Sequence, residues 1–239
     1  MRYPVLLLAS ALTACTAATA ESGTSVETRA IPVADRFDAV SLDGPDSVDV
    51  VPGDRVTIVA TGPANQLDRL NIRVEGSTLR IGRKRDGATS WMNWSRSAGE
   101  VRVRVTAPPL RAASLAGSGR LAVTGMRGDV VNLAIGGSGT LNAEGVRAGA
   151  ARLSIAGSGD LSASGQANRV DASVAGSGDI RATALASRRA SVSIAGSGNV
   201  DGRAAEQADI SIMGSGDVTI AGTSNCRISK MGSGQARCG

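Results

Sequence analysis

Apolar and polar residues alternate along much of this chain, on both sides of a short glycine-containing motif. Around the Gly-Ser-Gly that begins at Gly137, Leu133 and Ile135 precede the motif, and Leu141 and Ala143 follow it, in each case two positions apart. An alternation with period two is typical of strands that bury one face. A helix would need a period near 3.6. The pattern therefore predicts two strands joined by a tight corner.

The motif occurs seven times, at intervals of 18 to 20 residues. Its first and third glycines are Gly117, Gly119, Gly137, Gly139, Gly157, Gly159, Gly176, Gly178, Gly196, Gly198, Gly214, Gly216, Gly232 and Gly234. A regular period indicates stacked repeats, which pair their strand edges and bury one continuous core. We expect an all-β fold, a parallel β-solenoid or β-helix of 18–20-residue coils over residues 113–239. A flexible Gly-Ser linker would not keep an alternating aliphatic register.

The corner glycines have a physical reason in such a fold. A tight corner between strands requires a positive φ, at which a Cβ would clash. Stacked corners must also let neighbouring backbones approach closely. We therefore expect the glycines to be structural.

Residues 33–112 carry a weaker version of the same pattern. Val40 and Leu42 precede Gly44, and Val48 and Val50 follow it, at the offsets of the later repeats. Terminal repeats of stacked folds are usually atypical. We expect residues 33–112 to be divergent first coils of one domain covering 33–239, interrupted by an insert at 82–100. A separate small β domain is the alternative.

The first 20 residues are typical of a secretory signal peptide, with Arg2 before a short apolar run that is too short to span a bilayer. The end of the run, Leu12-Thr13-Ala14-Cys15, favours a lipobox cut with a lipid on Cys15; cleavage after Ala20 is the alternative. Residues 16–32 are predicted to be a flexible tether. We expect an outer-membrane lipoprotein or a periplasmic protein.

The three cysteines agree with export. If Cys15 is lipidated, Cys226 and Cys238 remain as a pair, and a disulfide between them suits an oxidising compartment. Two thiols in a chain without histidine are too few ligands for a metal site.

Several segments together resemble the head GIN domain family of putative auto-transporter adhesins. They are Phe37-Asp38-Ala39-Val40, the 70–81 hairpin LNIRVEGSTLRI, the Pro108-Pro109 stop and the repeated AGSG coils. The resemblance covers about residues 33–237. It implies a β-solenoid exposed in the envelope or at the surface, and no established activity.

The composition restricts the chemistry that the chain can perform. Histidine is absent, which excludes imidazole bases, Ser-His-Asp triads and His-ligated metals. The net charge of +5 is typical of a solvated surface and would also suit acidic polysaccharide, lipid head groups or nucleic acid. Export and the lack of a recognisable module argue against nucleic acid. We expect no cofactor.

Asp160 and Asp179 follow the corners of adjacent coils, so their carboxylates could lie about 5 Å apart, near the separation in retaining glycosidases. We expect no supporting basic group around this pair, and corner Asp residues commonly bond nearby backbone N–H groups. With Asp217 they are also weak candidates for a calcium site. A glycan-cleaving enzyme and a metal site are therefore alternatives that the sequence does not favour.

The insert at 82–100 is the stronger candidate for a binding site, because long loops in compact domains are often functional. It combines Arg83, Lys84 and Arg85 with Trp91 and Trp94, and aromatic side chains beside cations can stack on sugars or a partner surface. The sequence favours a lid over the open end of the solenoid or a mobile loop for this segment, and a contact site is the alternative.

The sequence thus favours a non-enzymatic cell-envelope protein, an adhesin-like binding or scaffold module. The alternatives are a polysaccharide-active enzyme and a purely structural spacer. Expected partners are envelope or extracellular polysaccharide or a surface protein, with membrane attachment through Cys15 if it is lipidated. The sequence leaves open whether the protein forms a homo-oligomer.

Overall fold

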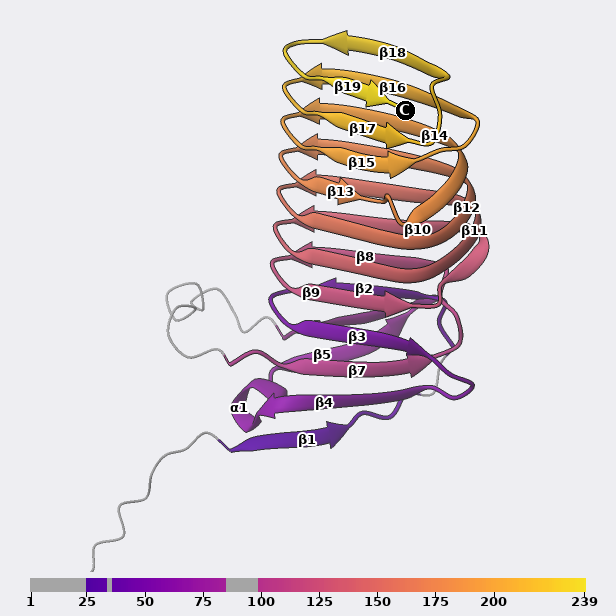
Figure 1. The fold of residues 1–239 in the computed structure, drawn as a ribbon. Coiled ribbons are helices and arrows are strands. Elements are labelled where there is room, and N and C mark those ends of the chain that lie inside the picture. Colours follow the sequence, from indigo (N-terminus) through magenta and orange to yellow (C-terminus); the bar gives the residue numbers. More distant parts are fainter. Residues whose placement is uncertain (1–24, 34–35, 85–98) are drawn as a thin grey trace, which may run out of the picture.

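The protein is a stack of coils built almost entirely from strands (Figure 1). The computed structural model describes residues 25–33, 36–84 and 99–239. Within these residues, 19 strands form one continuous sheet, and the helical element is α1 (Ala64–Leu67). The predicted parallel β-solenoid is therefore confirmed. No helix in the described part of the chain combines the length and apolarity needed to cross a membrane.

Each regular coil contributes one strand segment to each of two walls. The first wall holds the segments that lead into a Gly-Ser-Gly corner, and the second wall holds those that follow it. The first wall contains β8 (Ala112–Gly117), β10 (Arg127–Gly137), β14 (Leu185–Gly196), β16 (Gln207–Gly214) and β18 (Cys226–Met231). The second contains β9 (Arg120–Thr124), β13 (Asp179–Arg181), β15 (Val200–Arg203), β17 (Val218–Ala221) and β19 (Ala236–Cys238). The long strands β11 (Thr140–Gly157) and β12 (Asp160–Gly176) begin in the second wall and end in the first.

Parallel pairing in strict register produces the inner column. Ile135 pairs with Ile155, which pairs with Val174, and the column continues through Ile194 and Ile212. These side chains are buried, whereas the residues between them face outward. The alternation in the sequence is thus the alternation between the core and the solvent.

The first glycine of each corner allows the coils to stack. At the seven corners its φ lies between 118° and 136°. A Cβ on Gly137 would lie 2.6 Å from the carbonyl oxygen of Gly117 in the coil below. A side chain at this position would therefore strain the backbone and also push the neighbouring corner away.

The divergent N-terminal part contains two further coils. The strands β2 (Ala39–Asp43) and β3 (Ser47–Pro52) flank a corner at Gly44, and β6 (Thr78–Arg83) and β7 (Arg102–Ala107) form the next coil. The first of these coils lies inside the stack, because β2 pairs with both β6 and β8, and β3 with both β7 and β9. One buried cluster runs from Phe37 to Ile220.

The N-terminal end differs from the predicted series of coils because its last strands are antiparallel. The strand β5 (Leu70–Glu75) pairs with β6, β4 (Thr57–Pro63) pairs with β7, and β1 (Val26–Ala30) pairs with β4. The prediction of a tether over 16–32 is therefore wrong for residues 26–30. The Arg29 guanidinium contacts the Asp68 carboxylate at 2.6 Å, which helps to hold this polar strand on the sheet.

The C-terminal end is closed by the predicted disulfide. Cys226 at the start of β18 is bonded to Cys238 at the end of β19, which joins the two walls of the final coil. Lys230 occupies the inward position that Ile212 holds in the coil below, and its Nζ donates to the carbonyl oxygen of Gly234 at 3.4 Å. Edge strands with an inward lysine resist pairing with further strands.

Replacing Cys226 and Cys238 with serine is expected to loosen the final coil rather than unfold the whole stack. The bond closes a loop with a sequence separation of 12, which is worth about 3 kcal/mol in the chain-entropy model. Each coil contacts only its neighbours, so the loss should stay local. Amide hydrogen exchange should show faster exchange over 226–238 and unchanged exchange over 131–176. Unchanged protection of the final coil would contradict this role.

Candidate binding surfaces

The insert replaces a corner of the solenoid. Since β6 pairs with β2 and β7 pairs with β3, the residues between β6 and β7 take the place that Gly44–Asp46 take in the adjacent coil. The described chain leaves the stack after Lys84 and rejoins it at Gly99, on the side where the other corners lie (Figure 1). The insert is therefore attached to the corner edge, near the N-terminal end of the stack.

A buried ion pair fixes the start of this insert. The Asp46 carboxylate is fully buried and accepts two bonds from Arg83, at 3.0 Å from Nε and 2.5 Å from Nη2. It also accepts from the backbone N–H of Val101 at 3.2 Å, while Arg83 Nη1 donates to Gln66. The hydrogen bond to Asp46 raises the pKa of the Arg83 guanidinium, against the effect of burial. The Arg83 guanidinium therefore stays charged.

The candidate contact residues separate into two groups. Arg83 is one-fifth exposed and is held by Asp46, so its predicted contact with a ligand does not fit its position. Lys84 is exposed, and its Nζ donates to the backbone carbonyl of Asp68 at 3.0 Å. Arg85, Trp91 and Trp94 lie outside the described residues.

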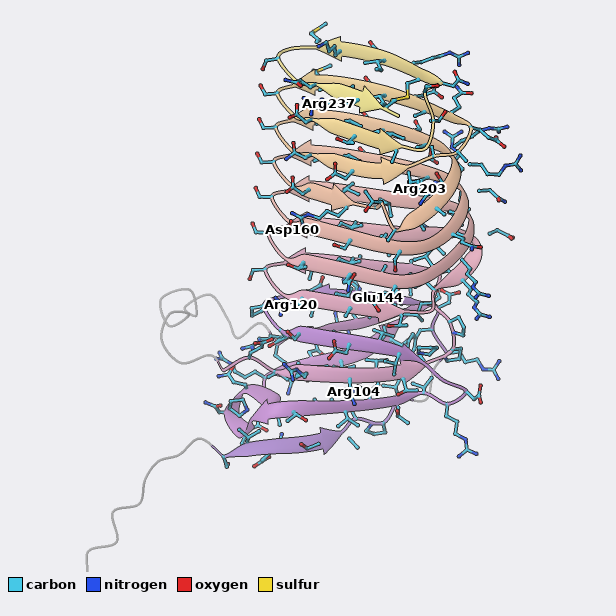
Figure 2. The ribbon with its side chains drawn as sticks, in the orientation of Figure 1. Arg104, Arg120, Glu144, Asp160, Arg203 and Arg237 are labelled. Carbon is cyan, nitrogen blue, oxygen red and sulfur yellow. A yellow bond between two sulfur atoms is a disulfide. The ribbon has the colours of Figure 1, made fainter. Side chains whose placement is uncertain are left out.

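The two walls present different outer surfaces. Serine and alanine face outward from the first wall; examples are Ser154, Ser173, Ser193, Ala156 and Ala175. The second wall carries longer polar and charged side chains, among them the labelled Arg104, Arg120, Glu144, Asp160, Arg203 and Arg237 in Figure 2. The second wall therefore presents longer side chains for polar contacts than the serine and alanine columns of the first wall.

The proposed carboxylate pair is bridged by an arginine. Arg181 donates from Nη1 to Asp160 at 2.9 Å and from Nη2 to Asp179 at 3.2 Å. The expectation that no basic group supports this pair is therefore wrong. The reason is geometric: Arg181 is two residues after Asp179 on the same outer face, and Asp160 is directly beside Asp179 in the next strand. The bridge holds both carboxylates in ion pairs with one guanidinium group.

The outward-facing position of Asp160 and Asp179 continues through the later coils as a hydrogen-bonded ladder. Asp179 accepts from the backbone N–H of Asn199, Asn199 accepts from that of Asp217, and Asp217 accepts from that of Gln235, at 2.8 to 3.2 Å. These side chains join successive coils. Within the described ranges, no group of three metal-ligating residues lies close enough to hold an ion.

A family model for "putative auto-transporter adhesin, head GIN domain" matches residues 36–224. The match covers most of the chain and both the regular and the divergent coils. This chain belongs to the head GIN domain family. None of the curated proteins compared with this GIN-domain protein matches it.

Solved structures of similar shape include proteins from Bacteroides and Parabacteroides. A putative adhesin from Bacteroides fragilis is 19% identical, with a TM-score of 0.79 over 90% of this chain and 97% of that one. A putative lipid binding protein from Parabacteroides distasonis is 24% identical, with a TM-score of 0.72 over 91% and 98%. A putative adhesin from Parabacteroides merdae is 18% identical, with a TM-score of 0.68 over 91% and 97%. At these identities the likeness shows the shared fold.

One interior void of this GIN-domain protein lies in the later coils. It has a volume of about 10 Å³ and is lined by small and aliphatic residues, including Ala172, Ala182, Gly202 and Ile220. This is room for about one water molecule. This void is too small to hold an acyl chain.

Proposed function

We propose that this protein is an exported, non-enzymatic, adhesin-like binding module that presents the 82–100 insert to its ligand. The observation that carries the proposal is the position of the insert. It replaces a corner in a stack whose other corners are tight, and the buried Asp46–Arg83 pair anchors its start. A rigid support beneath a long loop is a common arrangement for a binding site.

The contact residues of the proposed site are Lys84, Arg85, Trp91 and Trp94. Indole rings beside cations stack on the apolar faces of sugars and on partner surfaces. The ligand is then an envelope or extracellular polysaccharide, or a surface protein. Membership of a family of putative adhesins and a fold shared with putative adhesins support this function.

The non-enzymatic part of the proposal is supported by the exposed carboxylates. The acid pair of the second wall is bridged by Arg181 and is therefore occupied in structural contacts. Export is supported by the 1–20 signal and by the Cys226–Cys238 disulfide, which persists in oxidising compartments. The lipid on Cys15 and the outer-membrane or periplasmic location are part of the same proposal.

Replacing Trp91 and Trp94 with alanine is expected to weaken binding to its glycan or cell-surface ligand by about thirtyfold or more, since buried tryptophan anchors contribute about 2 kcal/mol or more. A glycan array followed by binding to whole bacterial cells would measure the loss. The matched control is Met213→Ala/Met231→Ala, which removes two exposed apolar side chains from the first wall.

Equal binding by the wild-type protein and the tryptophan variant would contradict the proposed site. Release of reducing sugar from a bound glycan, lost in an Asp160→Asn/Asp179→Asn variant, would contradict the non-enzymatic function.

A further inference from the structure

A row of arginines follows the edge of the solenoid opposite the Gly-Ser-Gly corners. Here the second wall of one coil turns into the first wall of the next. The row contains Arg127, Arg147, Arg152, Arg169, Arg188 and Arg189, all exposed. Figure 2 shows side chains with nitrogen at their tips gathered along this edge, on the right of the view. We call this row the arginine edge.

Arginines in this row stand directly beside one another. Arg127 pairs in register with Arg147, and Arg169 pairs in register with Arg189. Paired strands are about 4.8 Å apart, and like charges directly opposite each other destabilise a sheet. The fold does not require arginine here, because Gln166 occupies the position next to Arg147 in the following coil. The Arg127–Arg147 pairing therefore costs stability and is not required by the fold.

Acidic residues neutralise only the C-terminal part of the arginine edge. Arg169 contacts Asp171 at 2.6 Å, and Glu206 contacts Arg188 at 2.6 Å and Arg189 at 3.5 Å. In the described part of the chain, no carboxylate lies within ion-pair distance of Arg127, Arg147 or Arg152, although Asp129 is nearby in sequence. Within the described residues, two carboxylates thus pair with three of the six arginines, and Arg127, Arg147 and Arg152 have no carboxylate partner.

We propose that the arginine edge binds an acidic polysaccharide that runs along the stack. A guanidinium group offers paired donors that match a carboxylate. In an extended polyuronate each sugar carries one carboxylate, and a sugar is about as long as the spacing between two strands. Successive carboxylates can therefore meet successive coils, and the stiff stack requires no reorganisation on binding.

The geometry favours this ligand over a membrane surface. The guanidinium groups of Arg127 and Arg147 belong to strands paired in register and so follow one another along the stack, whereas anionic lipids present their charges in a plane. The exposed large apolar residues of the described chain are Val26, Val51, Met213, Ile228 and Met231, none of which belongs to the arginine edge. The edge therefore lacks the apolar groups that insert between lipids. It is also separate from the insert, which leaves the stack on the corner side.

The proposal is tested with Arg127→Gln/Arg147→Gln against the matched control Arg102→Gln/Arg104→Gln. Both variants lower the net charge by two, but Arg102 and Arg104 face outward from β7 on the second wall. Binding of polygalacturonate is measured by isothermal titration calorimetry at low and at physiological salt. Neutral dextran, galacturonate monomer and phosphatidylglycerol vesicles are the comparison ligands.

The wild-type protein should bind polygalacturonate in a salt-sensitive manner and should bind the monomer and dextran much more weakly. The Arg127→Gln/Arg147→Gln variant should bind at least about tenfold more weakly, and the control variant within about twofold of wild type. The melting temperature of the Arg127→Gln/Arg147→Gln variant should be unchanged or higher, because a like-charge pair has been removed.

The proposal would be overturned by no binding of polygalacturonate by the wild type, by equal weakening in both variants, or by a preference for the vesicles. The two proposed sites are also distinguishable. Polygalacturonate binding that depends on Trp91 and Trp94 but not on Arg127 and Arg147 would overturn the arginine edge and leave the insert as the binding site.

Discussion

Replacing Gly137 with alanine is expected to destabilise the protein by roughly 2–6 kcal/mol. Its φ is 126°, a conformation that costs a residue with a side chain about 1–3 kcal/mol. The new Cβ would lie 2.6 Å from the Gly117 carbonyl oxygen, and overpacking of this kind costs about another 1–3 kcal/mol. Chemical denaturation followed by circular dichroism would measure the difference.

The adjacent glycine supplies a matched control. A Cβ on Gly136 would meet its nearest neighbour, the carbonyl oxygen of Leu115, at 4.0 Å, and its φ is not in the positive range. Gly136→Ala should therefore change stability by less than about 1 kcal/mol. Equal effects of the two substitutions would mean that close stacking of the corners does not explain the motif.

The second large effect is expected at the ion pair beneath the insert. Asp46→Ala should destabilise the protein by about 3–5 kcal/mol, because it leaves the partly buried Arg83 and the Val101 N–H without their acceptor. Thermal and chemical unfolding would measure the loss. Hydrogen exchange should rise first in β6 and β7, the strands that flank the insert.

The control for this prediction is Asp43→Ala. Asp43 contacts Arg80 at 3.4 Å, and both side chains are more than two-fifths exposed, so the loss should be at most about 1 kcal/mol. In the Asp46→Ala background, Arg83→Met should restore part of the stability by removing the unpaired charge. If Asp46→Ala were as mild as Asp43→Ala, the pair would not be the anchor of the insert.

The regular coils could be predicted because one local pattern is repeated. Each coil places aliphatic residues such as Ile155 at the same offsets from a corner, so period and alternation together specify walls, corners and register. The disulfide was also predictable, because Cys226 and Cys238 form an even pair once Cys15 is assigned to the lipid.

The N-terminal end could not be predicted in the same detail. Whether a strand joins a stack in parallel or antiparallel orientation depends on non-local pairing, and the short polar β1 carries little apolar signal. The β2–β3 coil stacks between the β6–β7 coil and the β8–β9 coil, so the order of coils in the stack differs from their order in the sequence.

The roles of Asp46 and Arg181 could have been found from their positions relative to the corners. Asp46 stands where the other corners have their second glycine, and such a departure in a tightly packed position indicates a special role. Arg181 lies two residues after Asp179, the spacing that places both side chains on one face of a strand. The arginine edge was not visible in the sequence, because its members are spread over residues 127–189 and only the stacking register brings them together.

The stacking of corners is tested most directly by a distance between two of them. The corner serines form a ladder, with the hydroxyl oxygens of Ser215 and Ser233 3.0 Å apart. In a Cys15→Ser background, nitroxide labels at Ser118→Cys and Ser233→Cys are six coils apart, which corresponds to about 29 Å between the backbones at 4.8 Å per strand. Pulsed electron paramagnetic resonance should give one narrow distribution near this distance, after allowance for the label arms. A broad distribution, or one centred far from it, would contradict the solenoid.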